Sequence, residues 1–134
     1  MEAHEKAIRA LGEHFGKDGL ISYIELGSLG HWGEWHVNYK EGITRIPKET
    51  VRNQYVTPWL EAFPGVFMLM RRPFHIAEDY GMGLYNDMAG EKDSTEEWLT
   101  WIEEGGDYGQ AKEEDALSMM PDFWKTAPSG GEFT

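Results

Sequence analysis

The stretch LISYIELGSLGHWGEWH, residues 20–36, joins a strand signal to a loop crowded with ring and carboxyl side chains. Its first seven residues are rich in β-branched and aromatic types and are apolar on both faces except at Ser22 and Glu25. Such strands are typical of parallel sheets covered by helices. The next ten residues hold two Trp, two His, one Glu and three Gly, so the polar chemistry begins where the strand ends.

Helical patterns flank this strand on both sides. Residues 2–16 place Ile8 and Leu11 on one apolar stripe with charged residues around it, which predicts an amphipathic helix. Pro47 suits the first position of a second helix, whose imperfect apolar stripe runs to Phe63. Within that stripe Pro58 predicts a kink or a break.

Two further strands and a helix follow. VFMLMR (66–71) and MGLYND (82–87) have strand composition between turn signals. Ser94 and Glu97 then form the capping-box pattern S-x-x-E, which predicts a helix of about three turns beginning there. The alternation of helices and strands is the order of an α/β fold with a parallel sheet.

The last third of the chain carries weaker signals. The acidic, irregular stretch 103–123 is expected to hold a helix over 111–120. A short final strand is expected near 125–128, ahead of the sequence GGE. The four strands are then followed by HWGEWH, RRPFH, ND and GGE. Because the carboxyl ends of parallel strands share one edge of a sheet, these four polar clusters are expected to form one pocket.

This pattern resembles bacterial glycoside-hydrolase-like (β/α)8 barrels, in particular an uncharacterised family related to the β-galactosidase-like clan. The motif GSLGHWGEWH is the specific part of the resemblance. It implies that the chain holds the fourth to seventh strands of a partial TIM barrel, as one partial domain over residues 1–134. The clan places its acid/base glutamate after the fourth strand and its nucleophile after the seventh, which correspond to Glu34 and Glu132. The clan's acid/base glutamate usually follows an asparagine, whereas Gly33 precedes Glu34 here.

The expected function is therefore hydrolysis of a glycoside with retention, which requires one proton-donating and one ionised carboxyl. Flanking tryptophans would exclude water from Glu34 and favour its protonated form, and two glycines before Glu132 would admit a sugar. One of the two tryptophans is expected to stack on a sugar ring and the other to pack. The expected carbohydrate ligands are His31, Trp32, Trp35, His36, Arg71, Arg72, Asn86 and Asp87.

Two alternative functions stay open at this point. A carbohydrate-binding barrel without catalysis would keep the aromatic residues and lose the function of one carboxyl. A metal-dependent hydrolase would use His31, Glu34 and His36, although the spacing H-x-x-E-x-H with Gly33 inside it is not a helical zinc motif. A chelator separates the two, because only metal-dependent binding would be lost. The glycosidase interpretation needs no metal and no cofactor.

The composition limits the classes of partner that the chain can bind. The chain has 134 residues and a formal net charge of −12, which repels phosphate backbones and argues against nucleic acid. No apolar run reaches the ~18 residues of a membrane span. The absence of cysteine does not fix the compartment, and the N-terminus lacks the features of a signal peptide. An extracellular or periplasmic location of a full-length protein stays open.

The chain is too short for a complete barrel. A complete (β/α)8 barrel takes ~250 residues, so the chain is expected to be the central portion of a longer enzyme. Half a barrel leaves two strand edges and an apolar inner face uncovered. We therefore expect the isolated chain to associate with itself through these edges.

Overall fold

The computed structural model describes all residues from Met1 to Thr134. The helices are α1 (Glu2–Phe15), α2 (Glu49–Ala62), α3 (His75–Asp79) and α4 (Lys92–Glu104). The strands are β1 (Tyr23–Glu25), β2 (Phe67–Met70), β3 (Gly83–Ala89) and β4 (Ser129–Phe133). Three short 3-10 turns lie at His31–Gly33, Tyr39–Glu41 and Phe123–Lys125.

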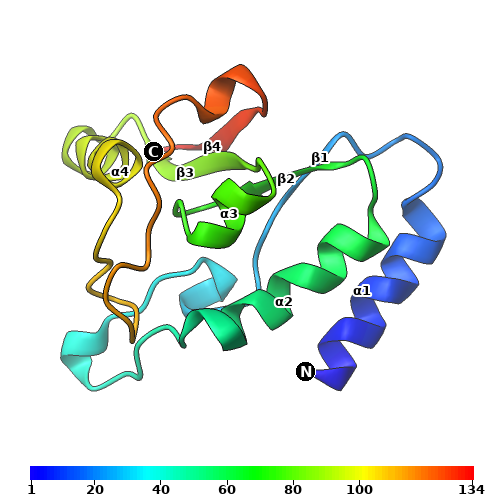
Figure 1. Ribbon diagram of the computed structural model, residues 1–134, viewed down its shortest axis with the longest axis horizontal. Coiled ribbons are helices and arrows are strands. Elements are labelled where there is room, and N and C mark those ends of the chain that lie inside the picture. The colour runs from blue at the N-terminus through cyan, green and yellow to red at the C-terminus, as the bar shows by residue number, and fades with distance from the viewer.

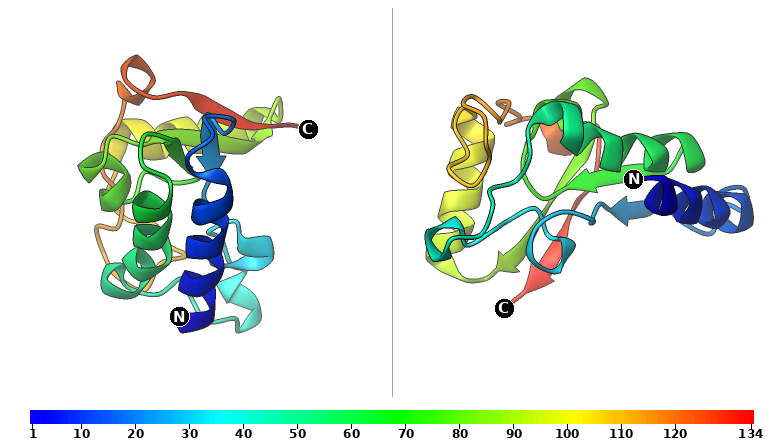
Figure 2. Two further views of the ribbon diagram at one scale, coloured as in Figure 1. Left: turned by 90° about the vertical axis from the view of Figure 1, so that its right-hand side faces the viewer. Right: turned by 90° about the horizontal axis from the view of Figure 1, so that it is seen from below.

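The four strands form one curled sheet in the order β1-β2-β3-β4, and every neighbouring pair is parallel. Each strand therefore lies beside the next strand along the chain, with a helix between them in the sequence (Figure 1). The helices gather on one side of the sheet, and β1 and β4 are its two edges (Figure 2). The predicted α/β class with four parallel strands is confirmed.

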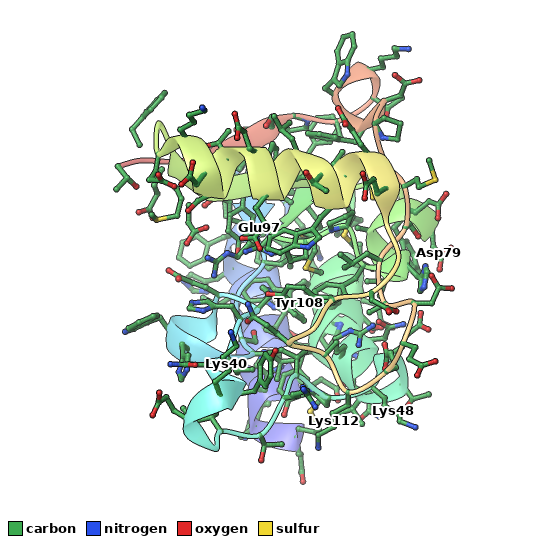
Figure 3. The ribbon with its side chains drawn as sticks, turned by 90° about the vertical axis from the view of Figure 1, so that its left-hand side faces the viewer. Lys40, Lys48, Asp79, Glu97, Tyr108 and Lys112 are labelled. Carbon is green, nitrogen blue, oxygen red and sulfur yellow. The ribbon has the colours of Figure 1, made fainter.

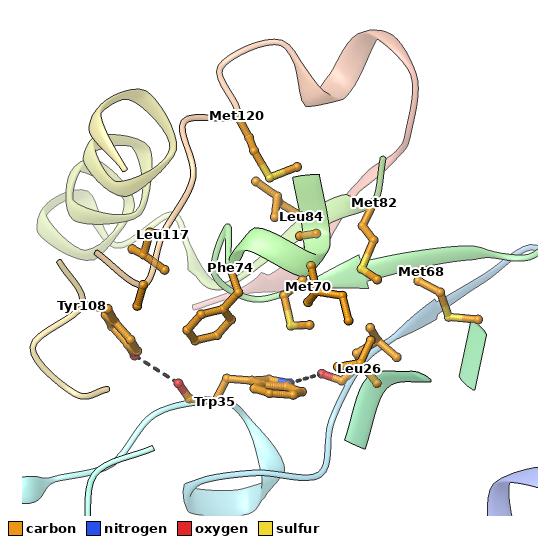
Figure 4. Close-up of a cluster of buried hydrophobic side chains, with 14 of the residues drawn as sticks. Leu26, Trp35, Met68, Met70, Phe74, Met82, Leu84, Tyr108, Leu117 and Met120 are labelled. Atoms are coloured by element: carbon orange, nitrogen blue, oxygen red, sulfur yellow. Dashed lines mark hydrogen bonds between the residues drawn. The ribbon is translucent and has the colours of Figure 1, made fainter. Parts of the chain in front are cut away.

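The core lies between the sheet and the helices. Met68, Met70 and Leu84 point from β2 and β3 into a cluster that includes Val56 of α2 and Trp98 of α4. Figure 4 shows this cluster extending to the loops through Leu26, Trp35, Phe74, Tyr108 and Leu117. Alternate strand residues thus face the helices, as in sheets of this kind.

The other face of the sheet is concave and only partly covered. Phe67 and Leu69 alternate with the core methionines and lie on this inner face. A Cβ on Gly130 would come within 2.6 Å of the Leu69 side chain and equally close to the Glu25 carboxylate. Glu25 of β1 therefore reaches across the curl toward β4, and Gly130 is required by that close approach.

Two predicted elements keep their places with changed limits. The strand predicted over 20–26 pairs with β2 only over Tyr23–Glu25. Helix α2 runs through Pro58 without a break. Its last turn packs on α1 so closely that a Cβ on Gly12 would meet the Ala62 carbonyl group. Pro58, predicted to interrupt the helix, is buried within it, and the helix continues to Ala62.

Three other predictions need correction: the cap of α4, the helix over 111–120, and the limits of the last strand. Helix α4 begins at Lys92, so Ser94 lies inside it. Its cap is Glu91, whose carboxylate accepts hydrogen bonds from the backbone N–H of Ser94 at 2.6 Å and of Asp93 at 3.3 Å. No helix forms over 111–120, because its backbone bonds distant segments, as in Leu117 N to Gly106 O at 2.9 Å. The last strand occupies Ser129–Phe133, after a 3-10 turn, where the expected strand was 125–128.

No helix combines the length and hydropathy that crossing a lipid bilayer requires.

Candidate functional site

The loop after β1, residues 27–37, is anchored by Trp35. This side chain is fully buried, and its indole Nε1–H donates to the carbonyl oxygen of Leu26 at 2.6 Å. The Tyr108 hydroxyl donates to the carbonyl oxygen of Trp35 at 3.1 Å (Figure 4). Hydrogen bonds thus hold both the side chain and the backbone carbonyl group of Trp35, and this buried side chain cannot touch a ligand. Its predicted role in substrate binding is corrected to one of positioning the loop.

The backbone of this loop is strained. Ser28, Trp32 and Trp35 have φ values of 120°, 52° and 60°, in a region that non-glycine residues rarely adopt. The loop closes on itself through His31 N to His36 O at 2.8 Å. The turn at Trp32 directs its indole outward, so that this side chain is 86% exposed. Strain of this kind concentrates at functional sites, where the surrounding structure maintains it.

A buried arginine links the loop to the next two strands. Arg71, which follows β2, donates from Nη1 to the backbone carbonyl oxygen of Glu34 at 2.5 Å. Its Nη2 forms an ion pair with Asp87 of β3. The Glu34 carboxylate lies 3.5 Å from Arg71 Nη1 and 3.5 Å from His36 Nε2. The polar ends of β1, β2 and β3 therefore converge, as predicted from their order along the chain.

The two histidines of the loop differ in their surroundings and hydrogen bonding. The backbone N–H of Asn38 donates to His31 Nε2 at 3.0 Å, so a neutral His31 carries its proton on Nδ1. Burial and the adjacent Arg71 guanidinium lower the pKa of His36, with Glu34 opposing them. His36 is therefore neutral at neutral pH, and a neutral imidazole offers one donor and one acceptor to a ligand.

Two neighbouring pockets open beside this cluster. The larger, of about 850 Å³, is walled by Trp32 and Tyr39 and by residues of α4 and the segment after it. The smaller, of about 180 Å³, is lined by Arg71, Arg72 and Asp87 among others. The pockets share His36, Glu97, Trp101 and Gln110, so they form one groove at the carboxyl edge of the sheet. In Figure 3, Glu97 of α4, Tyr108 and Lys40 lie around the larger part of it.

The predicted polar ligands at the end of β3 have different roles. Asn86 donates from its amide nitrogen to Thr95 Oγ1 at 3.2 Å and accepts from the backbone N–H of Met88 at 3.1 Å. Its amide thus fixes the turn into α4, although the residue lines the smaller pocket. Asp87 keeps its carboxylate at the pocket wall, held by Arg71.

Glu132 is the least constrained of the predicted residues. It lies inside β4, where the sequence had suggested a position after the last strand. Gly131 pairs with Asn86, so Glu132 lies beside the end of β3 at the same edge as Asp87. Its side chain is exposed, makes no hydrogen bond or ion pair, and lines neither pocket. The structure thus places Glu34 and Glu132 on the same edge, with β2 and β3 between their strands.

Several groove residues were not predicted from the sequence. Trp101 and Glu97 come from α4, and Gln110 from the irregular segment that follows. Trp98 and Trp101 are three residues apart on one helix, which is a signal for an aromatic face that reaches beyond the core. Gln110 had no signal, because its place depends on a hydrogen bond from the backbone N–H of Val37 to its Oε1 at 2.7 Å.

The arrangement gives no support to a metal centre. No three His, Asp or Glu side chains converge closely enough to hold an ion. His31, Glu34 and His36 were the candidates, and His31 Nε2 already accepts a backbone hydrogen bond. These three residues therefore do not form a metal site in this structure.

Comparison with known proteins adds no family assignment. Neither protein-family models, nor curated proteins, nor solved structures give a match to this chain.

Proposed function

We propose that the groove binds carbohydrate and that the chain contributes the fourth to seventh strands of a glycoside-hydrolase-like (β/α)8 barrel. The observation that carries the proposal is the outward indole of Trp32, held by a strained loop beside the carboxylates of Glu34 and Asp87. An exposed flat ring next to fixed hydrogen-bonding groups suits a sugar, which has apolar faces and a polar rim.

The remaining walls of the groove suit the same ligand. Tyr39 and Trp101 offer further aromatic surface, and His36, Glu97 and Gln110 offer donors and acceptors. A pocket of about 850 Å³ lies within the usual range for small-molecule sites, ~300–1,000 Å³. The net charge of −12 disfavours polyanions such as nucleic acid.

The proposed reaction is hydrolysis with retention. Glu34 would donate a proton to the leaving oxygen and later take one from water, and Glu132 would be the nucleophile. In support, Glu34 is 39% exposed and its Oε2 faces His36 and Arg71, two residues of the smaller pocket. Two observations support Glu132 as the nucleophile: its place at the same sheet edge and its carboxylate, which makes no hydrogen bond or ion pair.

Non-catalytic carbohydrate binding is the second candidate, and one observation favours it. The water-excluding surroundings expected for Glu34 are not formed, because Trp32 is 86% exposed and Trp35 is fully buried in the core. The groups nearest the Glu34 carboxylate are polar, with Arg71 Nη1 and His36 Nε2 each 3.5 Å from it.

Two measurements on the same variants separate these candidates. We expect Trp32→Ala to weaken oligosaccharide binding in calorimetry, while Glu34→Gln and Glu132→Gln abolish release of aryl alcohol from aryl glycosides and leave binding. Glu103→Gln is the matched control, because Glu103 is exposed on α4 and lines neither pocket. Binding without turnover in the unaltered chain would select the non-catalytic candidate. Absence of binding to any oligosaccharide would refute both.

A further inference from the structure

Arg72 is a buried cation without a counter-ion. Its side chain lies in the wall of the smaller pocket, and the residue is only 7% exposed. No carboxylate lies within ion-pair distance of it, whereas the other two buried arginines are paired, Arg71 with Asp87 and Arg52 with Glu113. A buried charge is costly unless it is paired and hydrogen-bonded, so Arg72 is the exception in this molecule.

The groups around Arg72 compensate for its burial only in part. Its Nη1 donates to the carbonyl oxygen of Arg71 at 3.1 Å, and Nε is buried with no acceptor. The guanidinium lies over the Trp101 ring at 4.2 Å from the centroid, with the Tyr108 ring at 5.7 Å. Desolvation lowers the pKa of Arg72, while the nearby Tyr108 and Asp87 oppose that shift. The stacking holds the guanidinium plane in place and leaves donors unused.

The pocket offers this cation a ligand of defined chemistry. A guanidinium presents a planar fork of N–H donors that matches the two oxygens of a carboxylate. Asp87 and Glu97 line the same pocket, so a doubly charged phosphate would meet more repulsion there than a singly charged carboxylate. A volume of about 180 Å³ limits the occupant to one small unit of a larger ligand.

We propose that Arg72 binds the carboxylate of an acidic sugar, so that the groove recognises a glycan containing a hexuronate. The neutral rings of that glycan would lie along the larger pocket over Trp32 and Trp101, and Glu97 and Gln110, shared by both pockets, would accept and donate hydrogen bonds to its hydroxyls. The inference rests on the proposed carbohydrate function and specifies its substrate class.

The test compares sugars that differ only at C6. Trisaccharides that carry a single terminal glucuronate, galacturonate or mannuronate are titrated calorimetrically against the full chain, each beside the trisaccharide with the neutral hexose at that position. We expect at least one uronate to bind about tenfold more tightly than its neutral partner, the order expected of charge-assisted hydrogen bonds. Arg72→Met should remove that preference and leave the binding of the neutral sugar, and Arg72→Lys should restore part of it.

The control is Lys112→Met, which removes an exposed cation outside both pockets and should keep the preference. If neutral and acidic sugars bind equally well, or if Arg72→Met keeps the preference with its fold intact by circular dichroism, the acidic-sugar inference is wrong and the carbohydrate function stands. If no sugar of either kind binds, the carbohydrate function fails too. If Arg72→Met does not fold, a preference that is smaller in Arg72→Lys than in Lys112→Met supports the inference, and an equal preference in the two variants overturns it.

Discussion

Trp32 and Trp35 lie three residues apart, one exposed and one fully buried, so the same substitution should change stability by very different amounts. Trp35→Ala removes a fully buried side chain and should lower the free energy of unfolding by about 3–5 kcal/mol. Trp32→Ala should change it by less than about 0.5 kcal/mol, because the indole packs on little else. Urea denaturation followed by circular dichroism measures both. Similar losses of unfolding free energy in the two variants would show that Trp35 does not stabilise the fold more than Trp32 does.

Two variants of Trp32 should differ in how much they weaken ligand binding. Trp32→Ala should weaken oligosaccharide affinity about three- to tenfold, the range for one aromatic stacking contact. Trp32→Phe keeps a smaller ring and should lose less. An unchanged affinity in Trp32→Ala would remove this residue from the site.

His36 gives the site a pH dependence of defined sign. Burial and Arg71 lower the pKa of His36 in the folded protein, so below pH ~6.5 the unfolded chain binds the proton more readily. The stability that comes from a neutral His36 is thus present above that pH and is lost as the pH falls through the folded value. We expect the free energy of unfolding to decrease from pH 7.5 to pH 5 and to do so less in His36→Gln. His14→Gln, an exposed histidine of α1, is the control and should keep the full slope.

At the scale of the element, the loop after β1 depends on two close backbone approaches. A Cβ on Gly30 would come within 2.7 Å of the His36 backbone nitrogen, and Gly30 has a φ of 82°. Gly65, in the turn before β2, has a φ of 81° with open space around the same position. Gly65→Ala should therefore cost about 1 kcal/mol for its backbone conformation alone. Gly30→Ala should cost a further ~1–3 kcal/mol for overpacking and should also abolish sugar binding. Equal unfolding free energies for the two variants would contradict this account of the loop.

Elements with a strong local pattern were predictable, and elements fixed by distant partners were not. Helix α1 and strands β2 and β3 follow from apolar periodicity and turn residues, which act within a few positions. The segment 111–120 has helix-compatible composition, but its backbone pairs with Ile46 and Gly106. The last strand depends on β3, since a Cβ on Gly131 would collide with the Asn86 backbone. Such pairings involve residues far apart in sequence and leave no local pattern.

At the scale of the whole molecule, the order of the strands decides which site residues could be foreseen. Parallel strands in sequential order bring all their carboxyl ends to one edge, so the meeting of Glu34, Arg71 and Asp87 was predictable. The opposite wall of the groove comes from α4 and the segment after it, whose position depends on side-chain packing. Trp101 and Gln110 were therefore missed. The identity of the loop anchor was also unpredictable in detail, because the sequence does not say which tryptophan is buried.

The uncovered inner face and edges of the sheet predict that the chain associates with itself. Tyr23 of β1 is 52% exposed and Phe67 of β2 is 49% exposed on the concave side or at its edge, and β1 and β4 each have one unpaired edge. Unpaired edges next to apolar surface favour association between chains. We expect sedimentation velocity to show a mass that increases with concentration.

Phe67→Lys places a charge on this face and should shift the chain toward monomer at a cost of under ~1 kcal/mol in unfolding free energy. Leu99→Lys changes a residue 44% exposed on α4, away from the sheet edges, and should leave association unchanged. A monomer at all concentrations in the unaltered chain, or an equal effect of the two lysines, would show that the concave face is not the surface that associates.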